Sequence, residues 1–478
     1  MPHTRSEAVG FRERAVPASG AKALVVGMGK SGLALARFLA AHGVGVRMAD
    51  LRAPEQLGDA LARLPPGTET VVGGYDRSVL NGCAAVYASP GVPWDAELLQ
   101  TARASGLTVS SEMDLFFRLC PGAIVGVTGT NGKTTTTALL AGVLAQGPRP
   151  VMVGGNIGDT VLDRLGELTP EHWVVLELSS FQLESCERPH ARIGVVLNIT
   201  PDHLDRHRTM DAYLAAKARL LRFQAPGDDA VLNGLDPFCR EMAEVTPARV
   251  TWFDRYQPAP PTQLPGRHNQ LNALAAAAAA RLAGLSDEAI ESGVRSFQGV
   301  EHRLEPVGEW GDVRWYNDSK ATNPDAGLVG LRAFEGLPVV LIAGGYGGGF
   351  PPHATPRSRL RGDPGEAGFA GTPGFPPHEA GFAGTPGFEL GDWLSAVRSG
   401  TRAAVLIGAS AAELAERLAG HPVQQAASLD EAVELARRLA RPGDVVLLSP
   451  AYKSFDMFAS YEERGRRFKA AVRGIHGG

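Results

Sequence analysis

The chain has 478 residues, a formal net charge of −4 at pH 7, 44% hydrophobic residues and 21% charged residues. This length suits about three domains, and the composition is that of a soluble globular protein. The small negative charge gives no overall basic character, which argues against extended binding to nucleic acid, and no apolar run approaches the roughly 18 residues of a membrane-spanning helix.

The N-terminal 20 residues are polar and mixed in charge. They contain no apolar stretch typical of a secretory signal, so we expect a flexible extension and a cytoplasmic location. The cysteines are Cys83, Cys120, Cys186 and Cys239. Their wide spacing matches neither a disulfide framework nor a metal site, which also fits a reducing compartment.

The first predicted domain begins with a strand, a helix and a second strand. It spans residues 21–117, with strands at 23–26, 45–49 and 84–88 and a helix at 33–43. Gly27, Gly29 and Gly32 give the GxGxxG spacing of a diphosphate-binding loop, and Asp50 stands where such folds contact a ribose. NAD and another diphosphate compound both fit. The turn at 89–93, SPGVP, follows the last of these strands, at an end where open α/β sheets bind ligands.

A second phosphate loop follows the apolar residues 123–125. Residues 126–137 read GVTGTNGKTTTT, so that backbone N–H groups, the Lys133 ammonium and the Thr134 hydroxyl can face phosphate oxygens and Mg²⁺. The strict pattern G-x-x-x-x-G-K-[ST] is not met, because position 127 is Val. We interpret the loop, with its glycines starting at Gly126, as a variant nucleoside-triphosphate site. A glycine-rich turn that binds nothing is the alternative.

Polar residues follow two further strands of the second predicted domain, residues 118–299. The strands are at 174–178 and 193–198, and they precede SSFQ at 179–182 and ITPDH at 199–203. The alanine-rich run at 272–285 predicts a packed helix.

The third predicted domain, residues 300–478, contains a repeat. Its predicted strands are at 313–317, 337–343 and 444–448. Between the last two, EAGFAGTPGF occurs at 366–375 and again at 379–388. Because the Gly- and Pro-rich segment 351–388 lacks apolar periodicity, we predict a disordered surface insertion, with a partner-binding segment as the alternative.

Lysine is rare in this chain. Only seven of its 47 basic residues are lysines, and Lys133, Lys217 and Lys320 all lie in candidate motifs. An ammonium is a compact charge that can lose its proton, which a guanidinium cannot do. We therefore expect chemical roles for these three side chains, although chance remains an alternative.

Nearly the whole chain carries motifs in a fixed order. They are GMGKSG, SPGVP, GVTGTNGKTTT, GGNIG, ELSSFQLE, NITPDHLDRH, YLAAKARL, LPGRHNQLNALAA, HRLE, YNDSKATN, LLSPAYKSFDMF and YEERG. Jointly they resemble the Mur ligases of peptidoglycan synthesis, and most closely the branch that adds D-glutamate. The resemblance implies an α/β protein with a Rossmann-like UDP domain, a central P-loop ATPase domain with a mostly parallel sheet, and a C-terminal Rossmann-like domain. It also implies that ATP drives amide bond formation between UDP-MurNAc-L-Ala and D-glutamate through an acyl phosphate. We expect a monomer that binds no nucleic acid and inserts into no membrane.

The resemblance further implies the site residues. For ATP these are Gly129, Thr130, Asn131, Gly132, Lys133, Thr134, Thr135, Asn272, Arg303 and Asp318, with Lys320 near the phosphates or the incoming amino acid. For the UDP substrate they are Lys30, Ser31, Asp50, Arg52, Ser89, Gly91, Asn156, Ser179 and Gln182, and for D-glutamate Thr322, Ser454 and Phe458.

Two Mg²⁺ ions are also implied. Their protein ligands would be Thr134, Glu177, His203 and a CO₂-derived carbamate on Lys217, and the implied catalytic residues are Lys133, Lys217, His203 and Lys320. Carbamylation needs an amine that can lose its proton, so an arginine could not replace Lys217. Local sequence alone also allows purely structural roles for these residues. Glu177 could be a helix cap, His203 a surface residue, Lys217 an exposed helix lysine and Phe458 a core aromatic.

One motif of the family is missing. Relatives usually read GGxDKGxDF after the strand at 337–343, and its lysine helps to bind a D-glutamate carboxylate, whereas residues 344–350 here read GGYGGGF. Lys453 stands where relatives carry a small residue. We predict that the flexible Lys453 ammonium replaces the missing cation at this carboxylate.

Other functions stay open at this point. A sister Mur ligase or a folylpolyglutamate synthase-type ligase shares the phosphate loop, but GMGKSG and SPAYKSFDMF favour the D-glutamate branch. An NAD-dependent oxidoreductase fits GxGxxG, but it gives no role to the phosphate loop or to YNDSKATN. A catalytically weakened nucleotide-binding relative would account for the missing Asp and Lys.

Overall fold

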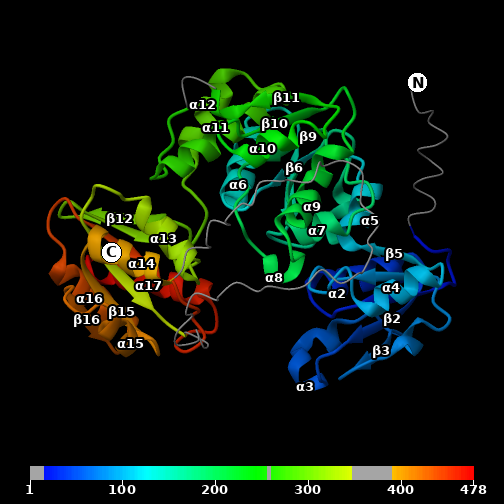
Figure 1. Cartoon of the computed structure of the whole chain (residues 1–478), viewed down its shortest axis with the longest axis horizontal. Coiled ribbons are helices and arrows are strands. Elements are labelled where there is room, and N and C mark those ends of the chain that lie inside the picture. The colour runs from blue at the N-terminus through cyan, green and yellow to red at the C-terminus, as the bar shows by residue number, and fades with distance from the viewer. Residues whose placement is uncertain (1–15, 256–259, 347–389, 478) are drawn as a thin grey trace, which may run out of the picture. The chain divides into compact units, whose positions relative to one another are not determined.

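The computed structural model describes residues 16–255, 260–346 and 390–477, so the predicted insertion at 351–388 and most of the N-terminal extension lie outside it. Three sheets are present in the described residues (Figure 1). The chain divides into two compact units. Unit 1 is Met1–Thr262 with Asn269–Phe297, and unit 2 is Gln263–His268 with Gln298–Gly478. The predicted α/β class with mostly parallel sheets is confirmed, and the three domain boundaries stay predictions.

The first sheet, in unit 1, is parallel and has the order β3-β2-β1-β4-β5. Its strands are β1 (Lys22–Val26), β2 (Gly45–Asp50), β3 (Glu69–Val72), β4 (Ala85–Ala88) and β5 (Thr108–Ser111), with helices α2 (Lys30–Ala41), α3 (Pro54–Leu57), α4 (Glu97–Ala104) and α5 (Glu112–Leu119). The chain order reverses between β1 and β4. The glycine loop after β1 and the turn after β4 therefore meet at a topological switch point, where open α/β sheets bind ligands.

The second sheet, also in unit 1, is parallel with the order β11-β10-β9-β6-β8-β7. Its strands are β6 (Ala123–Thr128), β7 (Val151–Gly155), β8 (Trp173–Glu177), β9 (Ile193–Val196), β10 (Asp229–Leu232) and β11 (Arg249–Trp252). Its helices are α6 (Lys133–Leu144), α7 (Ser180–Glu184), α8 (Leu204–His207), α9 (Met210–Arg222), α10 (Pro237–Met242), α11 (Arg267–Leu282) and α12 (Asp287–Ser296). Because β6 pairs with both β8 and β9, the polar residues that follow these three strands meet at one edge.

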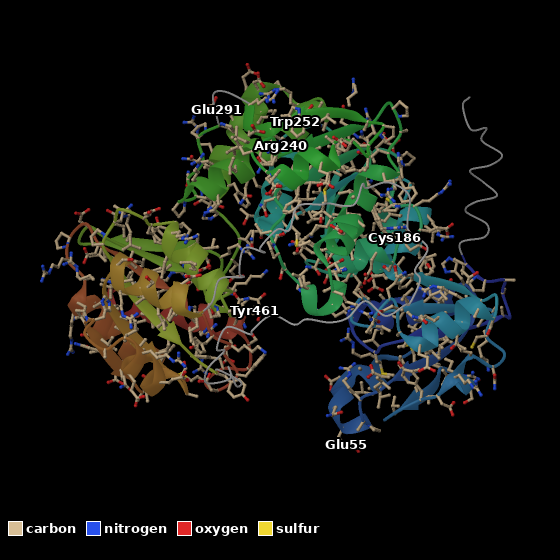
Figure 2. The ribbon with its side chains drawn as sticks, in the orientation of Figure 1. Glu55, Cys186, Arg240, Trp252, Glu291 and Tyr461 are labelled. Carbon is tan, nitrogen blue, oxygen red and sulfur yellow. The ribbon has the colours of Figure 1, made fainter. Side chains whose placement is uncertain are left out.

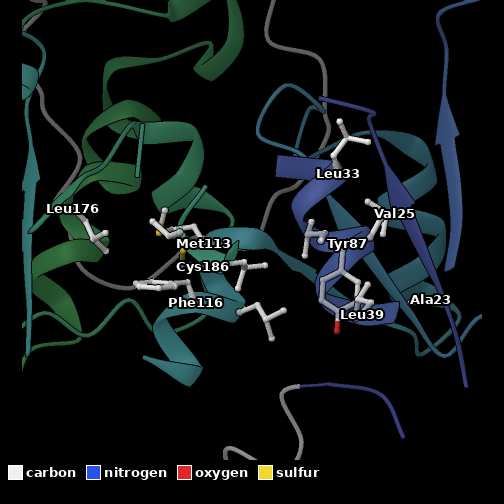
Figure 3. Close-up of a cluster of buried hydrophobic side chains, with 14 of the residues drawn as sticks. Ala23, Val25, Leu33, Leu39, Tyr87, Met113, Phe116, Leu176 and Cys186 are labelled. Carbon is white, nitrogen blue, oxygen red and sulfur yellow. The ribbon is translucent and has the colours of Figure 1, made fainter. Parts of the chain in front are cut away.

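One apolar cluster joins the first two sheets within unit 1. It combines Leu33 and Tyr87 from the first sheet and its helix with Met113 and Phe116 of α5. Leu176 of β8 and the buried thiol of Cys186 belong to the same cluster (Figure 3; Cys186 is also labelled in Figure 2). Burial of apolar surface stabilises by about 25 cal/mol per Å², so this shared core holds the two sheets in one compact unit.

The third sheet, in unit 2, has the order β12-β13-β17-β14-β15-β16, with β12 antiparallel to β13 and the other pairs parallel. Its strands are β12 (Glu305–Trp310), β13 (Val313–Asn317), β14 (Val339–Gly344), β15 (Thr401–Ile407), β16 (Val423–Ala426) and β17 (Val445–Leu448). Its helices are α13 (Pro324–Arg332), α14 (Leu390–Gly400), α15 (Ala411–Arg417), α16 (Leu429–Leu439) and α17 (Tyr461–Ile475). The loops after β13, β14 and β17 carry the motifs of this unit.

Several predicted boundaries are wrong: the first helix spans Lys30–Ala41 instead of 33–43, and two further differences concern the candidate site. The strand that precedes the phosphate loop runs to Thr128 instead of ending at residue 125. The alanine-rich helix α11 begins at Arg267, five residues before the predicted start, directly after Gly266 with a φ of 91°. Among the described residues no helix is both long and apolar enough to cross a membrane.

Candidate functional site

The phosphate loop lies between β6 and α6. It comprises Gly129–Gly132, because Gly126, which we expected in the loop, belongs to the strand. The reason is packing, since a Cβ at position 126 would lie 2.6 Å from Leu220 Cδ1. Gly129 and Gly132 have φ angles of 149° and 83°, a region that favours glycine. The loop thus leads into the N-terminus of a 12-residue helix, which attracts anions.

Contacts with neighbouring segments fix the loop. The Asn131 N–H donates to Asn198 Oδ1 at 2.9 Å, and Asn198 Nδ2 donates to the Asn131 carbonyl at 3.1 Å. Thr130 Oγ1 accepts from the Thr200 N–H at 2.9 Å and lies 3.0 Å from the Tyr213 hydroxyl. These bonds orient the loop from the segment after β9 and from α9.

Asn272 of α11 is the predicted ATP residue that lies against this loop. A Cβ at Gly132 would come within 2.4 Å of Asn272 Oδ1. Asn272 Nδ2 donates to Asn269 Oδ1 at 3.2 Å, which orients the amide. Thr134 and Thr135 are buried in the first turn of α6. Unit 1 therefore brings together the predicted ATP-binding segment 129–135 and Asn272.

Two lysines converge on the Gly129 carbonyl. Lys133 Nζ donates to it at 2.9 Å and to the Thr130 carbonyl at 2.7 Å, while Lys217 Nζ donates to it at 2.8 Å. Lys217 is only 1% exposed, and its Nζ lies 4.7 Å from the Tyr213 ring centroid. Burial, and then the positive charge of Lys133, lower the pKa of Lys217 well below the usual lysine range. The exposed helix lysine that local sequence allowed is excluded.

Glu177 ends β8 as a buried carboxylate. Its Oε1 accepts from Asn156 Nδ2 at 2.9 Å, whereas its Oε2 is buried and has no hydrogen-bond partner among the described residues. The cap of α7 is supplied instead by Ser179, whose Oγ accepts from the Gln182 N–H at 3.2 Å. A buried acceptor without a donor fits a cation, because an unmet carboxylate oxygen is costly.

His203 is exposed and has a left-handed backbone, with a φ of 53°. Its Nε2 lies 3.4 Å from Asp202 Oδ2, and its ring centroid lies 4.8 Å from that of Phe181. In the part of the chain that the structure describes, no group of three or more His, Cys, Asp and Glu side chains is arranged to hold a metal. A metal at Glu177 would therefore need ligands of other kinds, such as a hydroxyl, a modified lysine or phosphate oxygens.

The predicted UDP residues of the first sheet surround the glycine loop. Gly27 has a φ of 92°, and a Cβ at Gly32 would lie 1.9 Å from the Gly27 carbonyl. The same carbonyl accepts from Ser89 Oγ at 2.7 Å, which ties the loop to the turn after β4. At Gly91 an added Cβ meets nothing within 4 Å. Both segments therefore offer backbone to a ligand at the switch point.

Asp50 and Arg52 form a close pair at the end of β2. Asp50 accepts from Arg52 Nη2 at 2.7 Å and from the Met28 N–H at 2.7 Å. The bond to Arg52 lowers the pKa of Asp50 to about 2. The carboxylate that would contact a ribose in a dinucleotide site is thus already engaged, and the Arg52 guanidinium stays half-exposed.

The remaining predicted UDP residues have mixed environments. Lys30 is exposed at the start of α2. Ser31 hydrogen-bonds Glu112, a buried carboxyl whose pKa is raised by its burial. Gln182 is 4% exposed and its Oε1 accepts from the Ser179 N–H at 3.0 Å. Gln182 therefore stabilises the start of α7 in this structure.

In unit 2 the loop after β13 is strongly buried. Asp318 accepts from Ser449 Oγ at 2.8 Å and from the Leu304 N–H at 3.3 Å, and burial raises the pKa of Asp318 to about 7. Arg303 Nε is buried without a hydrogen-bond partner among the described residues. Lys320 Nζ lies 5.9 Å from the ring centroid of Tyr461, which is labelled in Figure 2.

Of the predicted D-glutamate residues, Lys453 lies beside the segment that follows β14. The Tyr346 N–H donates to the Lys453 carbonyl at 2.8 Å, and the two residues form an isolated β-bridge. The exposed Lys453 thus stands beside the altered motif. Ser454 and Phe458 are 2% and 8% exposed, and Phe458 packs in an apolar cluster, as expected of a core aromatic. Thr322 is half-buried.

Two arginines were missed by sequence reasoning. Arg464 is 0% exposed and donates to Ser319 and Tyr452, and Arg206 links α8 to Val92 and Glu184. Both stand inside quoted motifs, YEERG and DHLDRH, but arginine is frequent in this chain. Only their contacts distinguish them, and these contacts are a tertiary property.

Comparisons with known proteins all point to the same family. The description "Mur ligase MurD-like, N-terminal domain" matches residues 21–111, and "Mur ligase middle domain" matches residues 127–259. A UDP-N-acetylmuramoylalanine–D-glutamate ligase of Pelotomaculum thermopropionicum is 38% identical, over 94% of this chain and 97% of its own. A ligase of the same name from Solibacter usitatus is 40% identical, over 95% and 98%.

Solved structures agree on the fold. A crystal structure of MurF from Acinetobacter baumannii has a TM-score of 0.55 and 17% identity, covering 99% of each chain. The UDP-N-acetylmuramate-alanine ligase MurC of Thermotoga maritima has a TM-score of 0.54 and 18% identity, covering 95% of this chain and 99% of its own. At these identities the likeness concerns the fold alone.

Proposed function

This chain belongs to the Mur ligase family, and from that premise we infer that it is an ATP-dependent ligase that joins D-glutamate to UDP-N-acetylmuramoyl-L-alanine in peptidoglycan precursor synthesis. The observation that carries the activity is the phosphate loop Gly129–Gly132, with Lys133 and the buried Lys217 on one carbonyl. The glycine loop and SPGVP turn of the first sheet offer a separate diphosphate site in the same unit.

The chemistry requires activation of a poor electrophile. The γ-phosphoryl group of ATP passes to the carboxylate of the UDP substrate, and the amine of D-glutamate then displaces phosphate from the resulting acyl phosphate. We propose that Lys133 and the loop N–H groups stabilise charge on the phosphoryl group, as in other P-loop enzymes. Asn272, Arg303 and Asp318 would bind the rest of the nucleotide, and Lys320 would act near the phosphates or the incoming amine.

We further propose that Thr134, Glu177, His203 and a carbamate on Lys217 hold Mg²⁺. The unpartnered Glu177 Oε2 supports this, as does the burial of Lys217, which favours the neutral amine that reacts with CO₂. Bound Mg²⁺ would neutralise phosphate charge. Mass or density evidence for an unmodified Lys217 at saturating bicarbonate would disprove the carbamate.

The UDP substrate is proposed to contact Lys30, Ser31, Asp50, Arg52, Ser89, Gly91 and Asn156, with Ser179 and Gln182 nearer the sugar. D-glutamate is proposed to contact Thr322, Lys453, Ser454 and Phe458. We also propose a cytoplasmic monomer.

The decisive experiment incubates the protein with ATP, Mg²⁺ and UDP-MurNAc-L-Ala and measures phosphate release with a panel of amino acids. We expect release with D-glutamate alone. Release with L-alanine or a diamino acid would assign a sister ligase activity. No release with any amino acid, together with retained ATP binding, would assign the weakened nucleotide-binding relative that the altered GGYGGGF segment allows.

The amino-acid site has its own test. Lys453→Ala should raise the KM for D-glutamate about tenfold, because a charge-assisted bond to a carboxylate contributes roughly 1.5 kcal/mol or more. Lys469, paired with Glu301 and Glu305, gives a matched control, since Lys469→Ala removes a lysine of the same unit that has other partners. An unchanged KM in Lys453→Ala would show that another group binds the carboxylate.

A further inference from the structure

Helix α8 is a single turn between two residues with left-handed backbone. It spans Leu204–His207, and His203 before it and Arg208 after it have φ angles of 53° and 68°. A helix of one turn is not stable by its own backbone hydrogen bonds. Tertiary contacts must therefore set the orientation of this turn, and with it the backbone of His203.

Arg206 of α8 is more buried than Arg208, the arginine that follows the helix. Its side chain is 19% exposed, and its Nη2 donates to the Val92 carbonyl at 2.9 Å and to Glu184 Oε1 at 3.2 Å. Its guanidinium carbon lies 4.7 Å from the Phe181 ring centroid, so the group also stacks on an aromatic face. A guanidinium can donate in two directions while it stacks, which an ammonium cannot do.

The partners of Arg206 belong to both ligand sites of unit 1. Val92 lies in the SPGVP turn, where its N–H donates to the Ser89 carbonyl at 2.9 Å. Ser89 in turn holds the carbonyl of Gly27 in the glycine loop. On the other side, Phe181 and Glu184 lie in α7, which begins three residues after Glu177. Arg206 is thus a direct link between the diphosphate turn and the segments of Glu177 and His203.

We propose that Arg206 is a positioning residue that holds the SPGVP turn in register with the phosphoryl-transfer residues, so that the uridine nucleotide places its acceptor carboxylate correctly. This inference rests on the proposed function. It predicts a larger effect on the UDP substrate than on ATP, because Arg206 contacts the SPGVP turn directly, whereas the phosphate loop receives hydrogen bonds from Asn198, Thr200 and Lys217.

Arg208 supplies a matched control. Its Nη2 pairs with Asp95 Oδ2 at 2.7 Å, so it also joins α8 to the segment after the SPGVP turn, but the two side chains are 77% and 54% exposed. Exposed ion pairs contribute little to binding or stability, because water screens the two charges. Arg206→Ala and Arg208→Ala therefore remove the same residue type from positions two residues apart, and the two arginines differ in burial.

The test compares Arg206→Ala, Arg206→Lys and Arg208→Ala in steady-state kinetics and in calorimetric titration with UDP-MurNAc-L-Ala. We expect Arg206→Ala to raise the KM and the Kd for this substrate about tenfold, corresponding to one lost charge-assisted bond. The KM for ATP should change less than about twofold. Arg206→Lys should recover only part of the loss, and Arg208→Ala should resemble the wild type.

Equal effects of Arg206→Ala on both substrates, or an equal effect of Arg208→Ala, would overturn the proposal. Should Arg206→Ala fail to fold, Glu184→Gln weakens the same anchor while keeping its shape, and it must still raise the KM for the UDP substrate selectively. A wild-type protein that binds the UDP substrate but forms no product refutes the proposed function. The calorimetric comparison would then still decide the role of Arg206.

Discussion

Units 1 and 2 each bury a basic side chain beside a motif loop, and the two side chains differ in how their charge is satisfied. Lys217 in unit 1 donates to the Gly129 carbonyl at 2.8 Å and only weakly to Thr128 Oγ1 at 3.5 Å. Arg464 in unit 2 donates to Ser319 Oγ at 2.9 Å, to the Ser319 carbonyl at 2.8 Å and to the Tyr452 carbonyl at 3.1 Å.

The consequence is a difference in protonation. Burial lowers the pKa of Arg464 to about 10, so the guanidinium remains charged near pH 7. Burial and Lys133 lower the pKa of Lys217 well below its usual range, and the hydrogen-bond acceptors of its ammonium are a carbonyl and a hydroxyl, neither of which carries a charge. A buried cation with several acceptors fastens loops, whereas one with few acceptors is prepared to lose a proton and react.

The largest effect should come from Lys217→Arg. A guanidinium keeps its proton and cannot be carbamylated, so we expect kcat to fall about a thousandfold, as when a group that stabilises transition-state charge is lost. Phosphate release measures this. Lys217→Met is the control for folding, and its thermal midpoint should be unchanged or higher because a buried amine is replaced by an apolar side chain of similar length. If Lys217→Arg retained a tenth of the activity, Lys217 would not need to lose its proton, and the proposed difference between Lys217 and Arg464 would be wrong.

Arg464→Met should act on stability. It leaves the carbonyls of Ser319 and Tyr452 without donors, and we expect the free energy of unfolding of unit 2 to fall by about 3 kcal/mol. Urea unfolding followed by tryptophan fluorescence measures it. Arg466 lies two residues away on α17 and is exposed, so Arg466→Met should change stability by no more than about 0.5 kcal/mol. Similar values for the two variants would contradict a fastening role.

Asp318, near Arg464, should make the stability of the protein depend on pH. Burial raises the pKa of Asp318 from 3.8 to about 7, so between these values the folded protein holds a proton that the unfolded chain has lost. This group therefore makes unfolding easier as pH rises from about 4 to about 7, by roughly 2 kcal/mol between pH 5 and pH 7. Asp318→Asn should remove that component, seen as the difference between the two stability-versus-pH curves. Parallel curves would show that Asp318 titrates normally.

The smallest effects should come from deleting one hydroxyl near each buried basic side chain, at Thr128 near Lys217 and at Ser319 near Arg464. Thr128 Oγ1 donates to the Leu178 carbonyl at 2.8 Å, and Thr128→Val should cost about 1 kcal/mol. Ser319→Ala should cost more, about 2 kcal/mol, because it also leaves the Arg464 Nε–H without its acceptor. Thermal unfolding of both variants checks the order, and the reverse order would mean that the Arg464 contacts are not fully formed.

Much of the site was predictable from sequence because its chemistry is local. The phosphate loop, the switch-point turn SPGVP and the residues after β8 and β9 follow from strand ends and glycine spacing. Gly126 was misassigned because its role depends on Leu220 of α9, a contact that the loop sequence does not contain. Arg206 and Arg464 were missed for the same reason, since nothing near them in sequence indicates which distant groups they contact.

The sequence by itself determined the α/β class, the family and the identity of most candidate residues. Alternating strands, glycine loops and ordered motifs are each formed by residues that are close together in the sequence. Only the tertiary structure decided that Lys217 is buried beside Lys133, that Glu177 keeps one carboxylate oxygen without a donor, and that Arg206 joins the SPGVP turn to α7. These properties depend on which segments exclude water from each other. The exclusion of water sets the protonation and the orientation of a side chain. Water is excluded only after the sheets and helices have packed.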